Sequence, residues 1–456
     1  MGTPAPERPR AVLLGVQLPG VGDDEFASSL AELGRLAKTL GLEVIARVTQ
    51  RRRELAAAAV IGSGKLAELA RWTGGSGVVP VGPVRARGRA EAEAEAADDD
   101  AADEAPAAAA EPAPAQRASL VLIDHDVSPS QTRNLERATG AEVLDRTAVI
   151  LAIFQRHARS REARLQVEIA RLSYLAPRLR ESGGGKERQG GGIGGRGAGE
   201  SQIELDRRKL RDRVAELRAE LTAIEREAGT RRKRRSEHGT VALVGYTNAG
   251  KSSWMRALTG SGVRVEDKLF ATLDTTVRAL APEGVPRILV SDTVGFIKKL
   301  PHDLVASFRS TLDEARAADL LIHLVDASDA AFPAQIEVTR AVLDEIGAGD
   351  APRLLVLNKI DRVDAAARER LAAEWPDALP MSAREPADVE RLREQIRAHF
   401  ERGMVEAELL VPYAKQRVVG EAHRACRVLA ERHEPNGTHL RLRARPEVIA
   451  RLRAGL

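Results

Sequence analysis

The fold of this chain is decided by residues 241–253, which read Val-Ala-Leu-Val-Gly-Tyr-Thr-Asn-Ala-Gly-Lys-Ser-Ser. The four apolar residues predict a buried parallel strand, and the glycine spacing after them is that of a phosphate-binding loop between a strand and a helix. Glycines at these positions let backbone N–H groups point at phosphate oxygens, at the positive end of the next helix. A chance glycine turn is the weaker interpretation, because residues 252–258 have the composition of a helix. The stretch therefore predicts an α/β nucleotide-binding domain.

Two side chains of this loop have chemical roles of their own. Lys251 is expected to act as a catalytic residue that contacts the β- and γ-phosphates, and the Ser252 hydroxyl is expected to bind Mg²⁺. The loop residues predicted to contact the nucleotide are Gly245, Tyr246, Thr247, Asn248, Ala249, Gly250, Lys251 and Ser252.

Composition limits what the rest of the chain can be. With 456 residues the protein is too long for one domain and is expected to contain about three or four. Its hydrophobic fraction of 43% is enough for packed cores. The single cysteine, Cys426, excludes an intrachain disulfide and argues against a cysteine metal site. Residues 1–10 lack the apolar core of a signal peptide, and no stretch is long enough to span a membrane, so we expect a cytoplasmic protein.

An N-terminal α/β domain is predicted for residues 11–150, after a flexible N-terminus at residues 1–10. Strand and helix patterns alternate there, which favours a parallel sheet covered by helices. The expected strands are 11–17, 42–48 and 120–124, and the expected helices are 28–40, 66–72 and one that opens at 128–130. The turn Gly62-Ser63-Gly64-Lys65 lacks the leading glycine of a phosphate loop, since Ala59 holds that position. It predicts a turn before a helix and supports a second nucleotide site only weakly.

An acidic insertion interrupts this domain at residues 85–116. It combines glutamate and aspartate with alanine and proline, has nothing to bury, and is expected to be a disordered surface segment. An acidic docking segment is the alternative, although a solvated loop fits the composition better.

Residues 151–236 predict a helical hairpin that carries a glycine-rich loop at 182–202. Two apolar stripes with steps of three and four residues indicate a coiled-coil seam. The stripes are Leu165, Ile169, Leu172, Leu175 and Leu179 on one helix, and Leu210, Val214, Leu217, Leu221 and Ile224 on the other. Core packing explains these leucines without any further role.

The glycine-rich loop predicts contact with RNA. Basic residues stand among glycines that would let the backbone approach a phosphate ribbon closely. A flexible hinge is the alternative that composition leaves open. The basic run 231–235 after the second helix would either touch nucleic acid or form a solvated linker. The residues predicted to contact RNA are Lys186, Arg188, Gln189, Gly190, Gly191, Gly192 and Arg196.

The nucleotide domain is expected to run from 238 to 402, and the tetrapeptide 358–361 selects its base. It follows an apolar strand at the carboxyl edge of the sheet, where ligands bind in such folds. A carboxylate at Asp361 can accept two hydrogen bonds from guanine, whereas adenine would leave it unpaired. The residues predicted to contact the base are Asn358, Lys359, Ile360, Asp361, Ser382, Ala383 and Arg384.

Two further segments are predicted to surround the γ-phosphate and Mg²⁺. Asp292 would hold the metal through a water, and the N–H of Gly295, also a catalytic residue, would contact the γ-phosphate. Thr272 is the threonine assigned to Mg²⁺ and to catalysis, but Thr275 and Thr276 remain alternatives. These segments add to the nucleotide contacts Phe270, Ala271, Thr272, Leu273, Asp274, Asp292, Thr293, Val294 and Gly295.

The residue after Gly295 is Phe296, where Ras-like enzymes carry a glutamine that positions the attacking water. A phenylalanine side chain cannot orient water. We therefore expect slow intrinsic hydrolysis that a partner accelerates. Beyond this domain, residues 403–456 predict a small C-terminal α/β domain, with strands at 408–411 and 438–442 around a helix at 418–431.

At this point the chain resembles the HflX family of GTPases over almost its whole length, outside the acidic insertion and the extreme N-terminus. The stretches that carry the resemblance are Ile61–Leu66, Leu144–Thr147, Arg188–Gln202, Leu269–Asp274 and Asp292–Ile297 with its continuation through Leu300-Pro301. The glycine loop and the Asp-Thr-Val-Gly-Phe-Ile element together are highly specific to that family.

The resemblance implies an α/β N-terminal domain, a helical arm, a GTPase domain that uses Mg²⁺, and a short C-terminal domain. It also implies binding to the large (50S) ribosomal subunit and splitting or rescue of stalled ribosomes, often under stress. The loop at 183–199 would reach ribosomal RNA near the peptidyl-transferase region. The chain departs from the family pattern at four positions, namely Ala198, Ser201, Thr275 and Trp254, the last of which stands where leucine is usual.

Two other functions compete with a GTPase that acts on ribosomes. One is a regulatory switch in which GTP binding controls a protein partner. The other is a nucleotide-dependent enzyme that remodels RNA, which would need a second nucleotide site in the N-terminal domain. A monomer is expected, since the sequence shows no apolar seam that would need a partner, apart from the one inside the helical hairpin.

Overall fold

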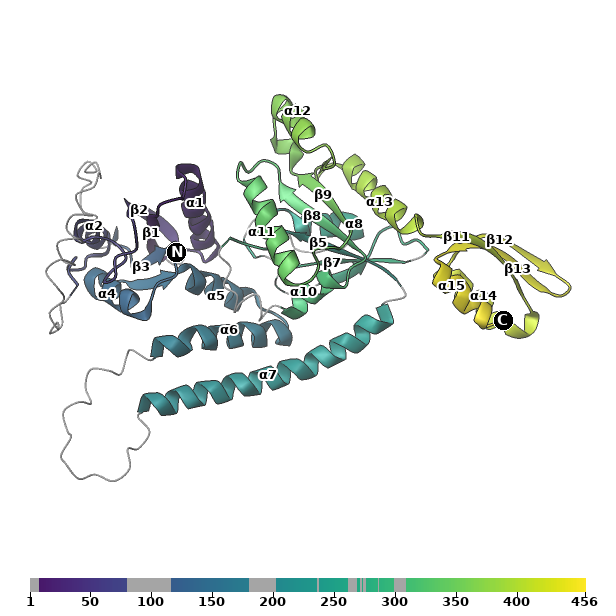
Figure 1. The fold of residues 1–456 in the computed structure, drawn as a ribbon, viewed down its shortest axis with the longest axis horizontal. Helices are drawn as coiled ribbons and strands as arrows, with labels where there is room; N and C mark the ends of the chain where they lie inside the picture. The colour runs from purple at the N-terminus through teal and green to yellow at the C-terminus, as the bar shows by residue number, and fades with distance from the viewer. Residues whose placement is uncertain are drawn as a thin grey trace, which may run out of the picture. The chain divides into compact units, whose positions relative to one another are not determined.

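The structure is a computed structural model that describes residues 8–79, 116–179, 202–235, 238–260, 269–270, 273, 276–285, 287–298 and 309–456 (Figure 1). The chain divides into two compact units, and the boundary between them falls inside the long helix α7, after Glu220. None of the helices in the described ranges is long and apolar enough to cross a membrane.

The first unit is built on a four-stranded parallel sheet, as the alternating pattern predicts. In the order β2-β1-β3-β4, its strands are β2 (Glu43–Arg51), β1 (Arg10–Gln17), β3 (Leu120–Ile123) and β4 (Glu142–Asp145). Its helices are α1 (Asp23–Thr39), α2 (Ser63–Thr73), α4 (Pro129–Thr139) and α5 (Arg146–His157). α1 packs with α5, and α2 packs with α4, so each pair covers one face of the sheet.

Local chemistry explains where these helices begin. α1 starts five residues before its expected position, because three acidic side chains, Asp23, Asp24 and Glu25, favour the positive end of a helix. α4 opens as predicted, with Ser128 and Gln131 forming a capping box. The turn at 62–65 begins α2, where Lys65 pairs with Glu68 at 3.1 Å.

The arm consists of α6 (Arg161–Leu179) and α7 (Gln202–Arg235). Two ion pairs join α6 to the first part of α7, Arg161–Glu220 at 2.6 Å and Arg213–Glu168 at 3.2 Å. In the predicted stripes, Leu165, Ile169 and Leu217 are buried. The predicted RNA contacts between these helices, residues 186–196, lie outside the described residues, as does the acidic insertion up to residue 115.

The second unit contains a six-stranded sheet in the order β10-β9-β8-β5-β7-β6, parallel except for β6. Its strands are β5 (Gly239–Gly245), β6 (Thr276–Ala279), β7 (Ile288–Asp292), β8 (Leu320–Asp326), β9 (Arg353–Asn358) and β10 (Leu379–Pro380). The helices beside it are α8 (Lys251–Thr259), α10 (Arg309–Arg316), α11 (Phe332–Glu345), α12 (Ala365–Glu374) and α13 (Pro386–Glu401).

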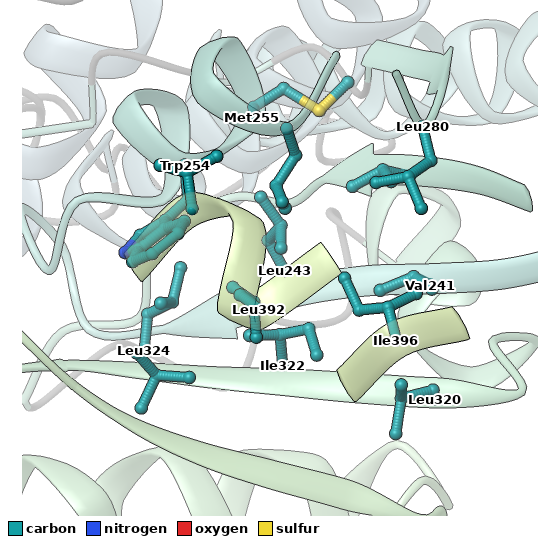
Figure 2. Packing of buried hydrophobic residues seen from close by; sticks show 14 of the residues in the cluster. Val241, Leu243, Trp254, Met255, Leu280, Leu320, Ile322, Leu324, Leu392 and Ile396 are labelled. Carbon is teal, nitrogen blue, oxygen red and sulfur yellow. The ribbon is translucent and has the colours of Figure 1, made fainter. Parts of the chain in front are cut away.

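One face of this sheet carries the main core, against α8 and α13 (Figure 2). Side chains of two strands and two helices form this core. They are Val241 and Leu243 of β5, Leu320, Ile322 and Leu324 of β8, Trp254 and Met255 of α8, and Leu392 and Ile396 of α13. α10 and α11 contact β5 and β8 from the sheet's other face. This packing fixes the carboxyl ends of β5, β7, β8 and β9 at one edge, where the predicted nucleotide residues gather.

The C-terminal part of the unit is a three-stranded antiparallel sheet with two helices. Its elements are β11 (Val405–Val411), α14 (Gln416–Ala425), β12 (Arg427–Glu434), β13 (Gly437–Ala444) and α15 (Pro446–Ala454), with strand order β11-β13-β12.

The helix predicted for residues 418–431 is wrong beyond Ala425. The backbone becomes extended at Cys426, and residues 427–434 form strand β12, which pairs with β13. The turn at Pro435-Asn436-Gly437 folds β13 back onto β12, and the ladder satisfies backbone groups that a continued helix would satisfy internally. Tertiary pairing therefore overrides the local helical pattern.

Candidate nucleotide-binding site

The phosphate loop has the backbone geometry that only glycine permits at two positions. Gly245 ends β5 with φ +145°, and a Cβ there would lie 2.1 Å from the Leu324 carbonyl oxygen. Gly250 has φ +101°, and a Cβ there would lie 2.2 Å from Nδ2 of Asn358. Both backbone conformations are strained for residues other than glycine, and a Cβ atom at either position would clash with a neighbouring atom. The motif spacing is thus explained by the space around the loop.

Lys251 is the first residue of α8, and its ammonium group is buried inside the loop. Nζ donates hydrogen bonds to the carbonyl oxygens of Gly245 at 2.9 Å and Tyr246 at 2.8 Å. Burial lowers the pKa of Lys251 to about 8, while the nearby Asp292 carboxylate works in the opposite direction and Lys359 adds to the lowering. A buried cation in this position is suited to bind an anion, because added negative charge offsets its desolvation.

Ser252 and Asp292 meet where the metal was predicted. The Ser252 hydroxyl donates to Oδ2 of Asp292 at 2.9 Å, across the gap between α8 and the end of β7. A hydroxyl and a carboxylate are oxygen donors of the kind that Mg²⁺ selects, so the donor set fits that ion. Next to them, the Thr293 hydroxyl donates to the Leu243 carbonyl at 2.7 Å, which fixes the start of the segment.

Gly295 packs directly on the phosphate loop. A Cβ at this position would lie 2.8 Å from Cα of Thr247 and 3.1 Å from Nζ of Lys251. The following residue, Phe296, is buried, and its backbone brackets the loop by donating to the Gly245 carbonyl at 3.2 Å and accepting from the Thr247 N–H at 2.7 Å. The structure therefore brings Gly295 next to Lys251, and both residues are predicted to contact the γ-phosphate.

Asn358 links the phosphate loop to the predicted base-binding loop. Its Nδ2 donates to the Ala249 carbonyl at 2.7 Å, and its Oδ1 accepts from the Ala383 N–H at 3.4 Å. Lys359 follows with φ +61° and forms an ion pair with Asp326 at 2.6 Å. Asp326 ends β8 at the same sheet edge, and our sequence analysis missed it, although its strand-end position is a signal.

The predicted guanine carboxylate lies beside the closing loop. Oδ1 of Asp361 accepts from the Ser382 hydroxyl at 2.7 Å, and Oδ2 lies 3.7 Å from the Arg384 guanidinium. The Ser382 N–H in turn donates to Asp388 at 2.8 Å, a second residue that sequence analysis missed. The segments at 358–361 and 382–384 thus form one hydrogen-bonded unit.

Several predicted contacts can act only through their backbone. The side chains of Ala249, Leu273, Val294 and Ile360 are buried in the protein. Phe270 is buried as well, with φ +56°. Thr276 lies in β6 opposite Asp292. The predicted residues Ala271, Thr272 and Asp274, and the alternative Thr275, lie outside the described residues.

The chain is similar to known proteins over nearly its full length. A family model described as "GTP-binding GTPase N-terminal" matches residues 27–80 and 102–155. One described as "GTP-binding GTPase Middle Region" matches 157–235, and one described as "50S ribosome-binding GTPase" matches 240–359.

Individual relatives extend this similarity. A protein named "GTPase HflX" from Gluconacetobacter diazotrophicus is 58% identical over 453 residues, which cover 99% of this chain and 98% of the relative. A second "GTPase HflX", from Caldanaerobacter subterraneus subsp. tengcongensis, is 36% identical over 98% of this chain and 94% of the relative. Among solved structures, a GTP-binding protein from Sulfolobus solfataricus in complex with GDP has a TM-score of 0.42 at 24% identity, and covers 86% of this chain and 98% of that chain.

Proposed function

Because the chain belongs to the HflX family of GTP-binding, GTP-hydrolysing proteins, we propose that it acts in the cytoplasm on the large ribosomal subunit and splits or rescues stalled ribosomes, particularly under stress. The observation that carries the proposal is similarity to proteins named GTPase HflX across all parts of the chain. Identity of 58% over 99% of the chain covers the N-terminal region and the arm as well as the GTPase region.

The proposed GTP site lies at the carboxyl edge of the six-stranded sheet. Lys251 and the N–H groups of residues 245–252 would hold the phosphates, and Asp361 would accept hydrogen bonds from guanine. The hydrogen bonds Ala383–Asn358 and Ser382–Asp361 support one continuous binding surface for the base. Ser252 and, through water, Asp292 would hold Mg²⁺, with Thr272 as the third proposed contact. When bound, Mg²⁺ would neutralise charge on the β- and γ-phosphates.

The arm is proposed to carry RNA contacts. α6 and α7 flank residues 182–201, and the ion pairs Arg161–Glu220 and Arg213–Glu168 connect the two helices. Residues 183–199 would then contact ribosomal RNA through backbone approach and through Lys186, Arg188 and Arg196.

We also propose that intrinsic hydrolysis is slow and that the ribosomal subunit accelerates it. Phe296 supports this, since its buried aromatic side chain has no group that could orient a water molecule. A rapid turnover of GTP by the purified protein alone would remove this part of the proposal.

The test is GTP hydrolysis by the purified protein, alone and with large ribosomal subunits, for wild type and for a deletion of residues 183–199. We expect stimulation by the subunit that is lost on deletion, with basal hydrolysis unchanged. A deletion of residues 86–115 is the matched control, because it removes another long segment, the acidic insertion, which contains none of the predicted RNA contacts and should keep the stimulation.

Other outcomes would favour the alternatives. Stimulation by a protein partner that does not depend on residues 183–199 would favour the regulatory switch. Nucleotide-dependent unwinding of RNA that survives Lys251→Met would favour a second site in the N-terminal domain. Absence of stimulation in both proteins would leave a GTPase but contradict the ribosomal role.

A further inference from the structure

Trp254 packs in the hydrophobic core and also makes a polar contact. It lies on α8, two residues after Ser252, and its side chain is fully buried in the core cluster that also contains Leu324 and Leu392. Figure 2 shows the indole nitrogen turned away from the labelled apolar side chains. That nitrogen, Nε1, donates a hydrogen bond of 2.9 Å to Oδ1 of Asn358. A buried indole N–H normally has such a partner, and here the partner belongs to the predicted base-binding loop.

The partners of Asn358 are arranged by the type of group they offer. Oδ1 accepts from Trp254 at 2.9 Å and from the Ala383 N–H at 3.4 Å, whereas Nδ2 donates to the Ala249 carbonyl at 2.7 Å. An indole N–H can only donate, so it requires the oxygen of the amide on its side. The amide nitrogen then faces the phosphate loop, close to Gly250. The orientation of the asparagine follows from these contacts.

We propose that Trp254 is a positioning residue for nucleotide binding, which acts through Asn358 to hold the phosphate loop and the base-binding loop in register. This inference rests on the GTP site proposed above. Leucine, the residue that the family resemblance leads one to expect at this position, has no donor.

The size of the effect follows from what Asn358 keeps when the indole is removed. In Trp254→Phe the ring still fills most of the core, but Oδ1 retains only the longer contact to Ala383. A buried acceptor that loses its better donor weakens the structure that depends on it. We expect the affinity for GDP to fall about tenfold and the KM for GTP to rise by about the same factor. The kcat should change less than about twofold, because Trp254 is fully buried and its indole N–H donates to Asn358, which is not one of the predicted catalytic residues.

The experiment measures GDP affinity by calorimetry, steady-state GTP hydrolysis and thermal unfolding without nucleotide, in wild type and Trp254→Phe. Trp375→Phe is the matched control, since Trp375 packs against Phe332 in another part of the same unit, with 5.7 Å between the ring centroids. We expect the control to bind GDP within twofold of wild type. Trp254→Leu, which also lacks the donor, should weaken binding at least as much as the phenylalanine variant.

A double-mutant cycle shows whether the effect passes through Asn358. Trp254→Phe added to Asn358→Ala should change GDP affinity by less than about twofold, because the acceptor is already gone. Full additivity of the two effects, or GDP affinity of Trp254→Phe within twofold of wild type, would overturn the inference. Failure of the site itself looks different, because Asn358→Ala and Asp361→Ala would then bind GDP as wild type does.

Discussion

The hydroxyl of Thr247 accepts a hydrogen bond of 3.0 Å from the backbone N–H of Phe270, so a side chain of the phosphate loop contacts one of the two segments predicted to surround the γ-phosphate and Mg²⁺. The neighbouring Tyr246 contacts the chain just after the other segment, since its hydroxyl accepts from the Lys298 N–H at 2.7 Å. Tyr246 and Thr247, the two residues after Gly245, are thus structural links as well as predicted nucleotide contacts.

Thr247→Val should release the segment around Phe270. Valine keeps the shape of threonine but offers no acceptor, which removes the hydrogen bond between Thr247 and the Phe270 N–H. The loss is expected to cost about 1–2 kcal/mol in local stability. Hydrogen exchange of the peptide that contains Leu269 and Phe270 should accelerate about tenfold or more. Thr259→Val is the control, since the Thr259 hydroxyl donates within α8 to Met255. Unchanged exchange in Thr247→Val would contradict the link.

Gly295→Ala should abolish most GTP hydrolysis. The added Cβ would lie 2.8 Å from Cα of Thr247, so the backbone must move away from Lys251 and the phosphate loop. Displacement of a catalytic backbone group by about 1 Å can slow a reaction roughly a hundredfold. Single-turnover hydrolysis checks this, with Gly284→Ala as control because a Cβ there has nothing within 4 Å. Equal rates for the two variants would show that the close contact at Gly295 is unimportant.

Lys251→Met should stabilise the nucleotide-free protein and abolish GTP binding. Burial lowers the pKa of Lys251 from 10.5 to about 8, so the charged form is disfavoured in the folded state. Below about pH 8 the amine is charged in both states, and methionine should then raise the free energy of unfolding by up to roughly 3 kcal/mol.

The gain should shrink between about pH 8 and 10.5, because there the folded protein loses the proton that the unfolded chain keeps. Denaturant unfolding at several pH values measures it. A gain that stays constant across this range would show that the buried charge is not its source.

Much of the site was predictable because it lies in short motifs at strand ends. Apolar runs reveal β5, β7, β8 and β9, and the motifs after β5, β7 and β9 predict phosphate, metal and base contacts. Strand β12 was not predictable in this way, since its side chains are mostly exposed and its conformation depends on pairing with β13.

The contacts between motifs were also beyond reach of the sequence. Trp254 and Asn358 are 104 positions apart, and Lys359 is 33 positions from Asp326. No local pattern records which donor faces which acceptor across such separations. The packing of α8 against the sheet brings the indole to the amide, so the sequence alone does not reveal the contact between Trp254 and Asn358.

Tyr174→Phe should destabilise the first unit by about 1–2 kcal/mol, because it removes a hydrogen bond to a buried carboxylate. The Tyr174 hydroxyl donates to Asp145 at 2.8 Å, and Arg178 of the same helix pairs with that carboxylate at 2.6 Å. Asp145 also caps α5 through the Ala148 N–H, so the arm helix and the sheet share one acidic group.

Burial raises the pKa of Asp145, while these donors oppose the rise. The cost of Tyr174→Phe should therefore be largest at pH values where Asp145 is ionised, and should narrow as the pH falls and the carboxyl group is protonated. Denaturant unfolding at neutral and acidic pH measures both effects. Tyr413→Phe is the control, because the hydroxyl of Tyr413 donates to the Glu434 carbonyl at an exposed position. Equal costs for the two variants at neutral pH would mean that the buried carboxylate gains nothing from Tyr174.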